Sequence, residues 1–164
     1  MAMLIAIALT IFIVESQLPP LVPVPGIKLG LANIVTLFVL IALGKREAFT
    51  VMVLRVILGS IFTGNMMSCM YSLAGGVLCF LFMSLGMRMF SEDNMVWCIS
   101  VSGAIGHNIG QIVMAVIMTK TPQVVWYLPL LLISAVITGV FTGLVTQYVL
   151  GHKAIKKMID RVKK

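Results

Sequence analysis

Charged residues are scarce in this chain: only 10% of its 164 residues are Asp, Glu, Lys or Arg, and only five of these are acidic. A soluble domain of this size needs far more charge to cover its surface, so an ordinary soluble protein is excluded. Apolar sequence dominates instead, with 60% hydrophobic residues and a mean hydropathy of +1.12. This composition predicts an integral protein of the lipid bilayer.

Patterns typical of catalysis and metal binding are also missing. The three cysteines, Cys69, Cys79 and Cys98, are odd in number and lack CxxC spacing, so we expect neither a disulfide framework nor a metal site. No Walker A motif, GxxxxGK(S/T), occurs, so any ATP must be hydrolysed by partner chains. We therefore expect a non-catalytic protein without a metal or another cofactor.

The net charge of +7 does not indicate a nucleic-acid partner, because the basic residues are unevenly distributed. Half of them lie at the end of the chain: Lys153, Lys156, Lys157, Arg161, Lys163 and Lys164. Such a cluster is typical of the cytoplasmic flank of a membrane protein. We expect residues 151–164 to form a basic cytoplasmic tail.

Apolar runs separated by glycine, proline and charged residues predict six transmembrane helices, since about 20 apolar residues cross a bilayer. The runs are 2–18, 29–43, 48–63, 68–87, 96–119 and 125–150. With both termini inside, nine basic residues lie on the inner side and only Lys28 and Lys120 on the outer side. By the positive-inside rule, this bias predicts cytoplasmic termini. The six runs predict an all-α, polytopic membrane protein, whose residues 1–150 form the six-helix domain.

Polar side chains inside the apolar runs are the most informative feature. At bilayer depth such a group costs several kcal/mol unless it is paired or faces a protected cavity. His107, Asn108 and Gln111 share one face of their helix, and His107 lies about 16 Å from the helix start, near mid-membrane. Arg55 also lies near the midplane of its run.

Other polar residues are expected at or above the midplane on the external side. Lys28 is at the outer surface, Asn33 about two turns below it, Glu15 near the outer end of the first helix, and Asn65 in a short outer loop. We therefore predict a substrate-binding pocket that is loaded from outside. Its residues are Glu15, Lys28, Asn33, Arg55, Asn65, His107, Asn108 and Gln111. The cationic members favour an anionic or strongly hydrogen-bonding ligand.

Purely structural roles are open for the same residues. Arg55 could pair with Glu15, and His107 and Asn108 could join helices through hydrogen bonds of about 0.6–2 kcal/mol each. Aromatic residues 126–127, at the outer start of the last run, could cover a planar or prenyl-like group or could anchor the helix in the membrane interface.

Small residues predict where helices pack closely. GxxxG motifs occur at 106–110 and 139–143, and we expect both to serve packing within the chain. Ala2 and Ala6 form an AxxxA pattern at the expected cytoplasmic end of the first helix. A face of this kind could dock another membrane protein.

Four segments carry a family resemblance: PGIKLGLANIV at 25–35, LRVILGS at 54–60, SLAGG at 72–76 and GAIGHNIGQ at 103–111. Together they closely resemble the Gx transporter family, whose members are often labelled heptaprenyl diphosphate synthase component I. That family is similar to the substrate-binding S components of energy-coupling factor (ECF) importers, which are six-helix proteins.

The resemblance implies a function in the bacterial cell membrane. An S component binds a vitamin-like molecule near the outer face and docks through its first helix to a transmembrane coupling (T) subunit, which two cytoplasmic ATPases drive. Ala2 and Ala6 match the docking motif. By this resemblance, the chain captures a small vitamin-like molecule, or one related to isoprenoids or quinones.

The enzyme label itself conflicts with the residues. Prenyl diphosphate synthases hold magnesium and diphosphate with clustered aspartates, whereas this chain has only Asp93 and Asp160, far apart. An intramembrane enzyme component related to prenyl diphosphates stays open as one alternative. A self-sufficient small transporter or channel is another, although we find no internal repeat, and Glu15 is the one acid within the predicted membrane region.

Overall fold

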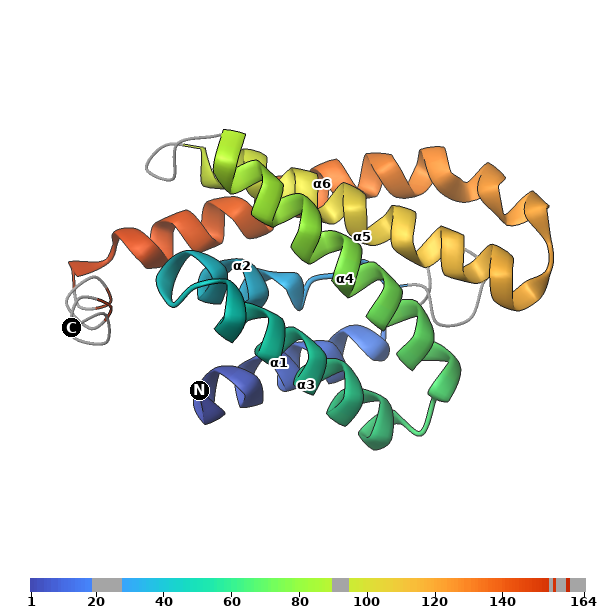
Figure 1. The fold of residues 1–164 in the computed structure, drawn as a ribbon, viewed down its shortest axis with the longest axis horizontal. Helices are drawn as coiled ribbons and strands as arrows, with labels where there is room; N and C mark the ends of the chain where they lie inside the picture. Colours follow the sequence, from blue (N-terminus) through green and yellow to red (C-terminus); the bar gives the residue numbers. More distant parts are fainter. Residues whose placement is uncertain (19–27, 90–94, 154, 156–158, 160–164) are drawn as a thin grey trace.

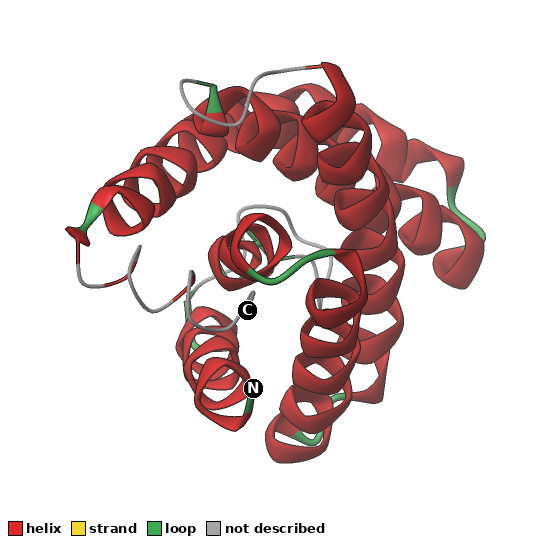
Figure 2. Ribbon diagram, turned by 60° about the vertical axis from the view of Figure 1, so that its left-hand side comes forward, coloured by secondary structure: helices red, strands yellow, loops and turns green. Residues whose placement is uncertain are grey.

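Figure 1 shows the computed structural model, which describes residues 1–18, 28–89, 95–153, 155 and 159. Every regular element in these residues is a helix (Figure 2). The elements are α1 (Ala2–Ser16), α2 (Asn33–Ala42), α3 (Lys45–Thr63), α4 (Met66–Met89), α5 (Val96–Thr119), the 3-10 helix η1 (Pro122–Tyr127) and α6 (Leu128–Gly151). For this part of the chain, the prediction of an all-α protein with six α-helices is confirmed.

Local sequence determines where several helices end. Gly64 follows α3 with a φ of +64°, a left-handed conformation that glycine adopts without strain. Asn65 then caps α4, because its Oδ1 accepts a hydrogen bond from the Ser68 backbone N–H at 3.0 Å. Pro122 and Pro129 stand in the first turns of η1 and α6, where a missing N–H does no harm.

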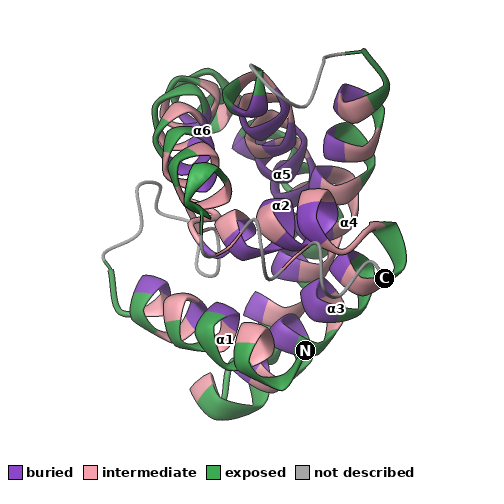
Figure 3. Ribbon diagram, turned by 90° about the vertical axis from the view of Figure 1, so that its left-hand side faces the viewer, coloured by how far each residue is buried: buried purple, intermediate pink, exposed green. Residues whose placement is uncertain are grey.

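The helices form an arc around α2. Along the arc α1 packs against α3, α3 against α4, α4 against α5, and α5 against α6, while α2 contacts every other α-helix. Successive helices run in opposite directions, so the start of α1 and the end of α6 lie at the same end of the bundle (Figure 1). Figure 3 shows α2 in the middle, with the buried faces of its neighbours turned toward it.

Glycines bring α4, α5 and α6 into backbone contact. A Cβ at Gly110 of α5 would lie 2.6 Å from the Ala74 carbonyl oxygen of α4. One at Gly143 of α6 would lie 2.5 Å from Trp97 Cα of α5. Backbone atoms cannot move aside as a flexible side chain can, so both GxxxG motifs require their glycines for packing within the chain.

Three segments are long and apolar enough to cross a membrane, judged by length and composition: α4, α5 and the continuous η1–α6 segment of 30 residues. Helices α1 and α2 are apolar but shorter. Large apolar side chains also point outward; Phe62 and Ile133, for example, are 69% and 62% exposed. The chain is a multi-pass membrane protein, and six complete crossings stay a prediction.

The second predicted membrane helix differs most from the structure. The sequence predicts a span over 29–43, whereas α2 begins only at Asn33 and has 10 residues. At 1.5 Å per residue it is about 15 Å long, about half the thickness of a bilayer's hydrocarbon core. Residues 28–32 are non-helical, and Gly30 among them has a φ of +82°.

The other predicted runs agree with the helices to within three residues at each end, and α5 has the predicted bounds. Three sets of residues on which predictions were made fall outside the described residues: 19–27, Asp93, and most of the basic tail, 151–164, which includes Asp160.

Candidate functional site

Six of the eight predicted site residues converge inside the bundle. All of them are buried except Lys28, which is half-buried. They come from four helices and the segment before α2: Glu15 (α1), Lys28, Asn33 (α2), Arg55 (α3), His107 and Gln111 (α5). This cluster of six residues lies in the half of the bundle that contains the end of α1 and the start of α2.

Glu15 explains the shape of the segment before α2. Its carboxylate accepts hydrogen bonds from the backbone N–H of Gly30 and, at 3.3 Å, from that of Ala32. A helix start leaves such amides without partners, and a negative charge there suits the helix dipole. The left-handed φ of Gly30 and the contact with Glu15 together delay the helix to Asn33, a tertiary effect that hydropathy does not reveal.

Arg55 is only 2% exposed, and its Nη2 donates a hydrogen bond to Asn33 Oδ1. Its Nε has no hydrogen-bond partner, and it forms no ion pair among the described residues. Glu15, the ion-pair partner that the sequence left open, instead accepts from backbone amides. A buried charge without a direct counter-charge is costly. The site therefore contains a guanidinium that no carboxylate neutralises by contact.

Lys28 adds a second cation outside the helices. Its Nζ lies 3.5 Å from the centroid of the Phe12 ring, a cation–π contact. Burial lowers the pKa of Lys28 to about 8, an effect that Glu15 opposes and Arg55 reinforces. Lys28 is therefore close to its titration range at neutral pH.

His107 and Gln111 connect α5 to the same segment. With its amide oriented so that both ends pair, Gln111 accepts from the Lys28 N–H at 3.1 Å and from His107 Nε2 at 3.2 Å, and donates to the Lys28 carbonyl oxygen at 2.9 Å. The His107 ring lies between two glycines: a Cβ would come within 2.8 Å of it both at Gly30 and at Gly75. Side chains at these glycines would displace the ring.

Four of the six residues, Glu15, Lys28, Arg55 and His107, line a cavity of about 10 Å³, which has room for about one water molecule. Its lining comprises Phe12, Glu15, Lys28, Gly30, Arg55, Val56, Ser72 and His107. Four polar atoms in this lining are buried and have no hydrogen-bond partner among the described residues: Lys28 Nζ, Arg55 Nε, Ser72 Oγ and His107 Nδ1.

The structure places the two remaining predicted residues elsewhere. Asn108 Nδ2 donates to the Leu131 carbonyl oxygen of α6 at 2.6 Å, so Asn108 joins two helices. Asn65 is exposed and caps α4. Trp126 is 85% exposed, and neither it nor Tyr127 lines the cavity.

Four lining residues were not predicted as site residues; one of them, Val56, is an apolar residue within an apolar helix. Ser72 lies in the small-residue segment SLAGG, which could have drawn attention to it, whereas Phe12 is one apolar residue among many in α1. Gly30 could have been recognised as a helix breaker. The predicted docking residues Ala2 and Ala6 are exposed on the first half of α1, whereas the lining residues Phe12 and Glu15 lie in its second half.

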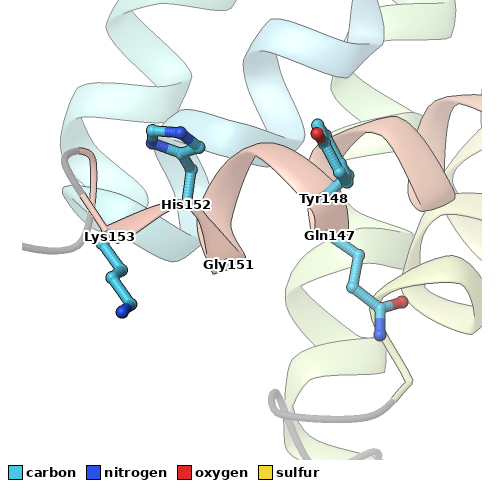
Figure 4. A pocket seen from close by; sticks show the side chains of 5 residues that line it. All are labelled: Gln147, Tyr148, Gly151, His152 and Lys153. Carbon is cyan, nitrogen blue, oxygen red and sulfur yellow. The ribbon is translucent and has the colours of Figure 1, made fainter.

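A second, larger hollow of about 510 Å³ lies at the surface near the end of α6. Figure 4 shows that Tyr148 and His152 extend to one side of the helix, while Gln147 and Lys153 extend to the other. Because these polar side chains diverge, the smaller cavity is the better candidate site. The described residues contain no group of three or more His, Cys, Asp or Glu that could hold a metal ion.

Fold and site together define a class: a multi-pass helical membrane protein whose interior holds a cluster of polar and cationic side chains. A family model described as heptaprenyl diphosphate synthase component I matches residues 4–149. The chain belongs to this family, which confirms the resemblance found in the sequence. No curated protein and no solved structure matches it.

Proposed function

We propose that this chain is the substrate-binding subunit of an ECF-type importer in the bacterial cell membrane. It captures a small vitamin-like molecule, or one related to isoprenoids or quinones, from the outer side. The observation that carries the proposal is the set of four buried, unpartnered polar atoms around one cavity. Such groups are costly at membrane depth and are typical of sites that bind a substrate. The prenyl diphosphate in the family description supports an isoprenoid-related ligand.

The distribution of charge supports loading from outside. Lys45, Arg46, Arg88 and Lys153 belong to the helix ends that share one end of the bundle with the start of α1. The cavity lies toward the opposite end. Under the positive-inside rule the basic end faces the cytoplasm, and the cavity is nearer the outer face.

The exposed side of α1 supports docking to a coupling subunit. Among the described residues, the major contacts of this helix are with α2 and α3, and side chains on another side of it, such as Met3 and Ile7, are exposed. Ala2 and Ala6 lie on that exposed side, and small residues allow another helix to approach closely. The chain itself performs no catalysis in this proposal; two cytoplasmic ATPases supply the energy through the coupling subunit.

Native mass spectrometry of the purified chain in mild detergent tests substrate capture. We expect a stoichiometric small molecule that is lost in His107→Ala and retained in His152→Ala. The second change removes the same kind of side chain from an exposed position just after the end of α6, away from the cavity. A chain that carries no molecule, or one that His107→Ala and His152→Ala affect equally, would contradict the proposed site.

Co-purification tests the docking. When the chain is produced together with the coupling subunit and ATPases of its own cell, Ala6→Leu should abolish co-purification and leave ligand binding intact. Val136→Leu, an exposed change on α6, is the control and should retain the partners. A chain that transports its ligand without any partner would favour the self-sufficient transporter instead.

A further inference from the structure

The charges around the cavity are not balanced. Three charged side chains line it: Glu15, Lys28 and Arg55. Both oxygens of the Glu15 carboxylate accept backbone N–H groups. Within the part of the chain that the structure describes, the close partners of the two cations are an aromatic ring for Lys28 and an amide oxygen for Arg55. The cavity therefore has two cationic donors in its lining and one carboxylate whose oxygens already accept backbone N–H groups. With Lys28 protonated, these two positive charges and one negative charge give a net charge of about +1.

Resting on the proposed function, we infer that the substrate is an amphiphilic acid, and that its oxyanion, a carboxylate or a phosphate, sits between Lys28 and Arg55. Lys28 Nζ and Arg55 Nε are buried donors without hydrogen-bond partners in the lining of one cavity, and Ser72 Oγ is a third group available to the same oxyanion. Charge-assisted hydrogen bonds to such donors are about twice as strong as neutral ones. A neutral or cationic molecule would leave the buried charge unbalanced.

The apolar part of the ligand follows from the rest of the wall. Phe12 of α1 and Val56 of α3 form apolar lining beside the two cations. Removing an apolar group from water against such a wall is favourable by about 25 cal/mol for each Å² buried. An acid with an attached apolar group therefore matches both halves of the cavity, whereas a fully polar acid matches only one.

The cavity must widen to admit this ligand, because about 10 Å³ is too small for a carboxylate or a phosphate. The Lys28 ammonium is the group that can move most easily, since its close contact is the face of the Phe12 ring and it has no hydrogen bond. When it leaves the ring for the oxyanion, it exchanges a cation–π contact for an ion pair and opens the wall next to Phe12.

Four molecules with the same ten-carbon apolar chain test the inference: geranyl phosphate, geranic acid, geraniol and geranylamine. Each is added to the purified full chain in detergent, and the unfolding midpoint and the dissociation constant are measured. We expect at least one acid to raise the midpoint, while geraniol and geranylamine leave it unchanged. Comparison of the two acids identifies the preferred oxyanion, and inorganic phosphate and acetate measure how much the apolar part contributes.

Two variants with matched controls connect the binding to the two cations. Lys28→Gln should weaken binding of the acid at least tenfold, and Arg55→Lys should do the same because lysine lacks the planar guanidinium. Lys120→Gln and Arg88→Lys make the same changes at exposed positions and should have no effect. If Arg55→Lys does not fold, the affinity of Lys28→Gln alone tests the inference. We expect this variant to fold, because Lys28 lies outside the helices.

The outcomes separate this inference from the proposed function. Equal affinity for geraniol and the acids, or unchanged affinity in Lys28→Gln, would overturn the acid as substrate class. A neutral molecule that co-purifies with the chain and depends on His107 would overturn it too and would leave substrate capture standing. A chain that binds neither a native molecule nor any probe would refute both.

Discussion

Exchange of Asn33 for aspartate separates the stability of the cluster from its ability to bind an acid. Asn33 Oδ1 accepts a hydrogen bond from Arg55 Nη2, while Asn33 Nδ2 is buried without a partner. In Asn33→Asp a carboxylate of nearly the same shape contacts the guanidinium. The hydrogen bond becomes an ion pair, and the unpartnered donor disappears. We expect the free energy of unfolding to rise by about 1 kcal/mol, since hydrogen bonds between charged groups are stronger.

The same change should weaken binding of the acid. An oxyanion on the other nitrogens of Arg55 would lie about 5 Å from the new carboxylate, and at an effective dielectric constant of about 20 their repulsion is about 3 kcal/mol. That corresponds to an affinity lower by about a hundredfold. The assays are unfolding in a denaturant titration and titration with geranyl phosphate or geranic acid, whichever binds the wild-type chain.

A matched control makes the result decisive. Asn65→Asp adds the same charge at the same end of the bundle, but Asn65 is exposed and its cap on α4 is kept by aspartate. We expect near wild-type affinity in this variant. If Asn33→Asp binds the acid as tightly as the wild type, or if both variants lose the same affinity, the placement of the oxyanion at Arg55 is refuted.

Three further predictions follow from the same contacts. Gly75→Ala should lower the free energy of unfolding by about 1–3 kcal/mol, because its Cβ would lie 2.8 Å from His107 Nδ1 and 2.9 Å from the His107 carbonyl oxygen; Gly151→Ala, which meets nothing within 4 Å, should not lower it. Glu15→Gln should lower the free energy of unfolding by about 1–2 kcal/mol, because one of the two side-chain oxygens that accept the amides of Gly30 and Ala32 is lost. Glu47→Gln, the control, should change it little. Affinity for the acid should fall as pH rises through about 8, because burial lowers the pKa of Lys28 to that value and only the protonated ammonium attracts an anion. The affinity is measured at constant ionic strength. A constant affinity from pH 7 to about 9.5 would contradict this role of Lys28.

Apolar runs, and the glycine, proline and charged residues between them, made much of the fold predictable. An apolar run of 24 residues between polar ends predicts α5 with its observed bounds, and Gly64 marks the end of α3. The GxxxG spacing predicts that α5 and α6 each pack closely against a neighbouring helix. The structure confirms this, because Gly110 of α5 contacts α4 and Gly143 of α6 contacts α5. These features depend on residues near one another in the chain, so the sequence contains them directly.

The sequence also determined which residues are chemically unusual. A charged or amide side chain inside an apolar run is conspicuous because hydrocarbon offers it no partner, whatever the fold. Six of the residues selected on this basis do meet around one site.

Only the tertiary structure decided how these residues are used. Glu15 binds the amides before α2 rather than pairing with Arg55, and Asn108 turns to α6 while its neighbour His107 turns to the cavity. The start of α2 at Asn33 depends on a carboxylate 17 residues away from Ala32 in the chain. Partners for buried polar groups are chosen by which helices lie side by side, and hydropathy along a single chain does not contain that information.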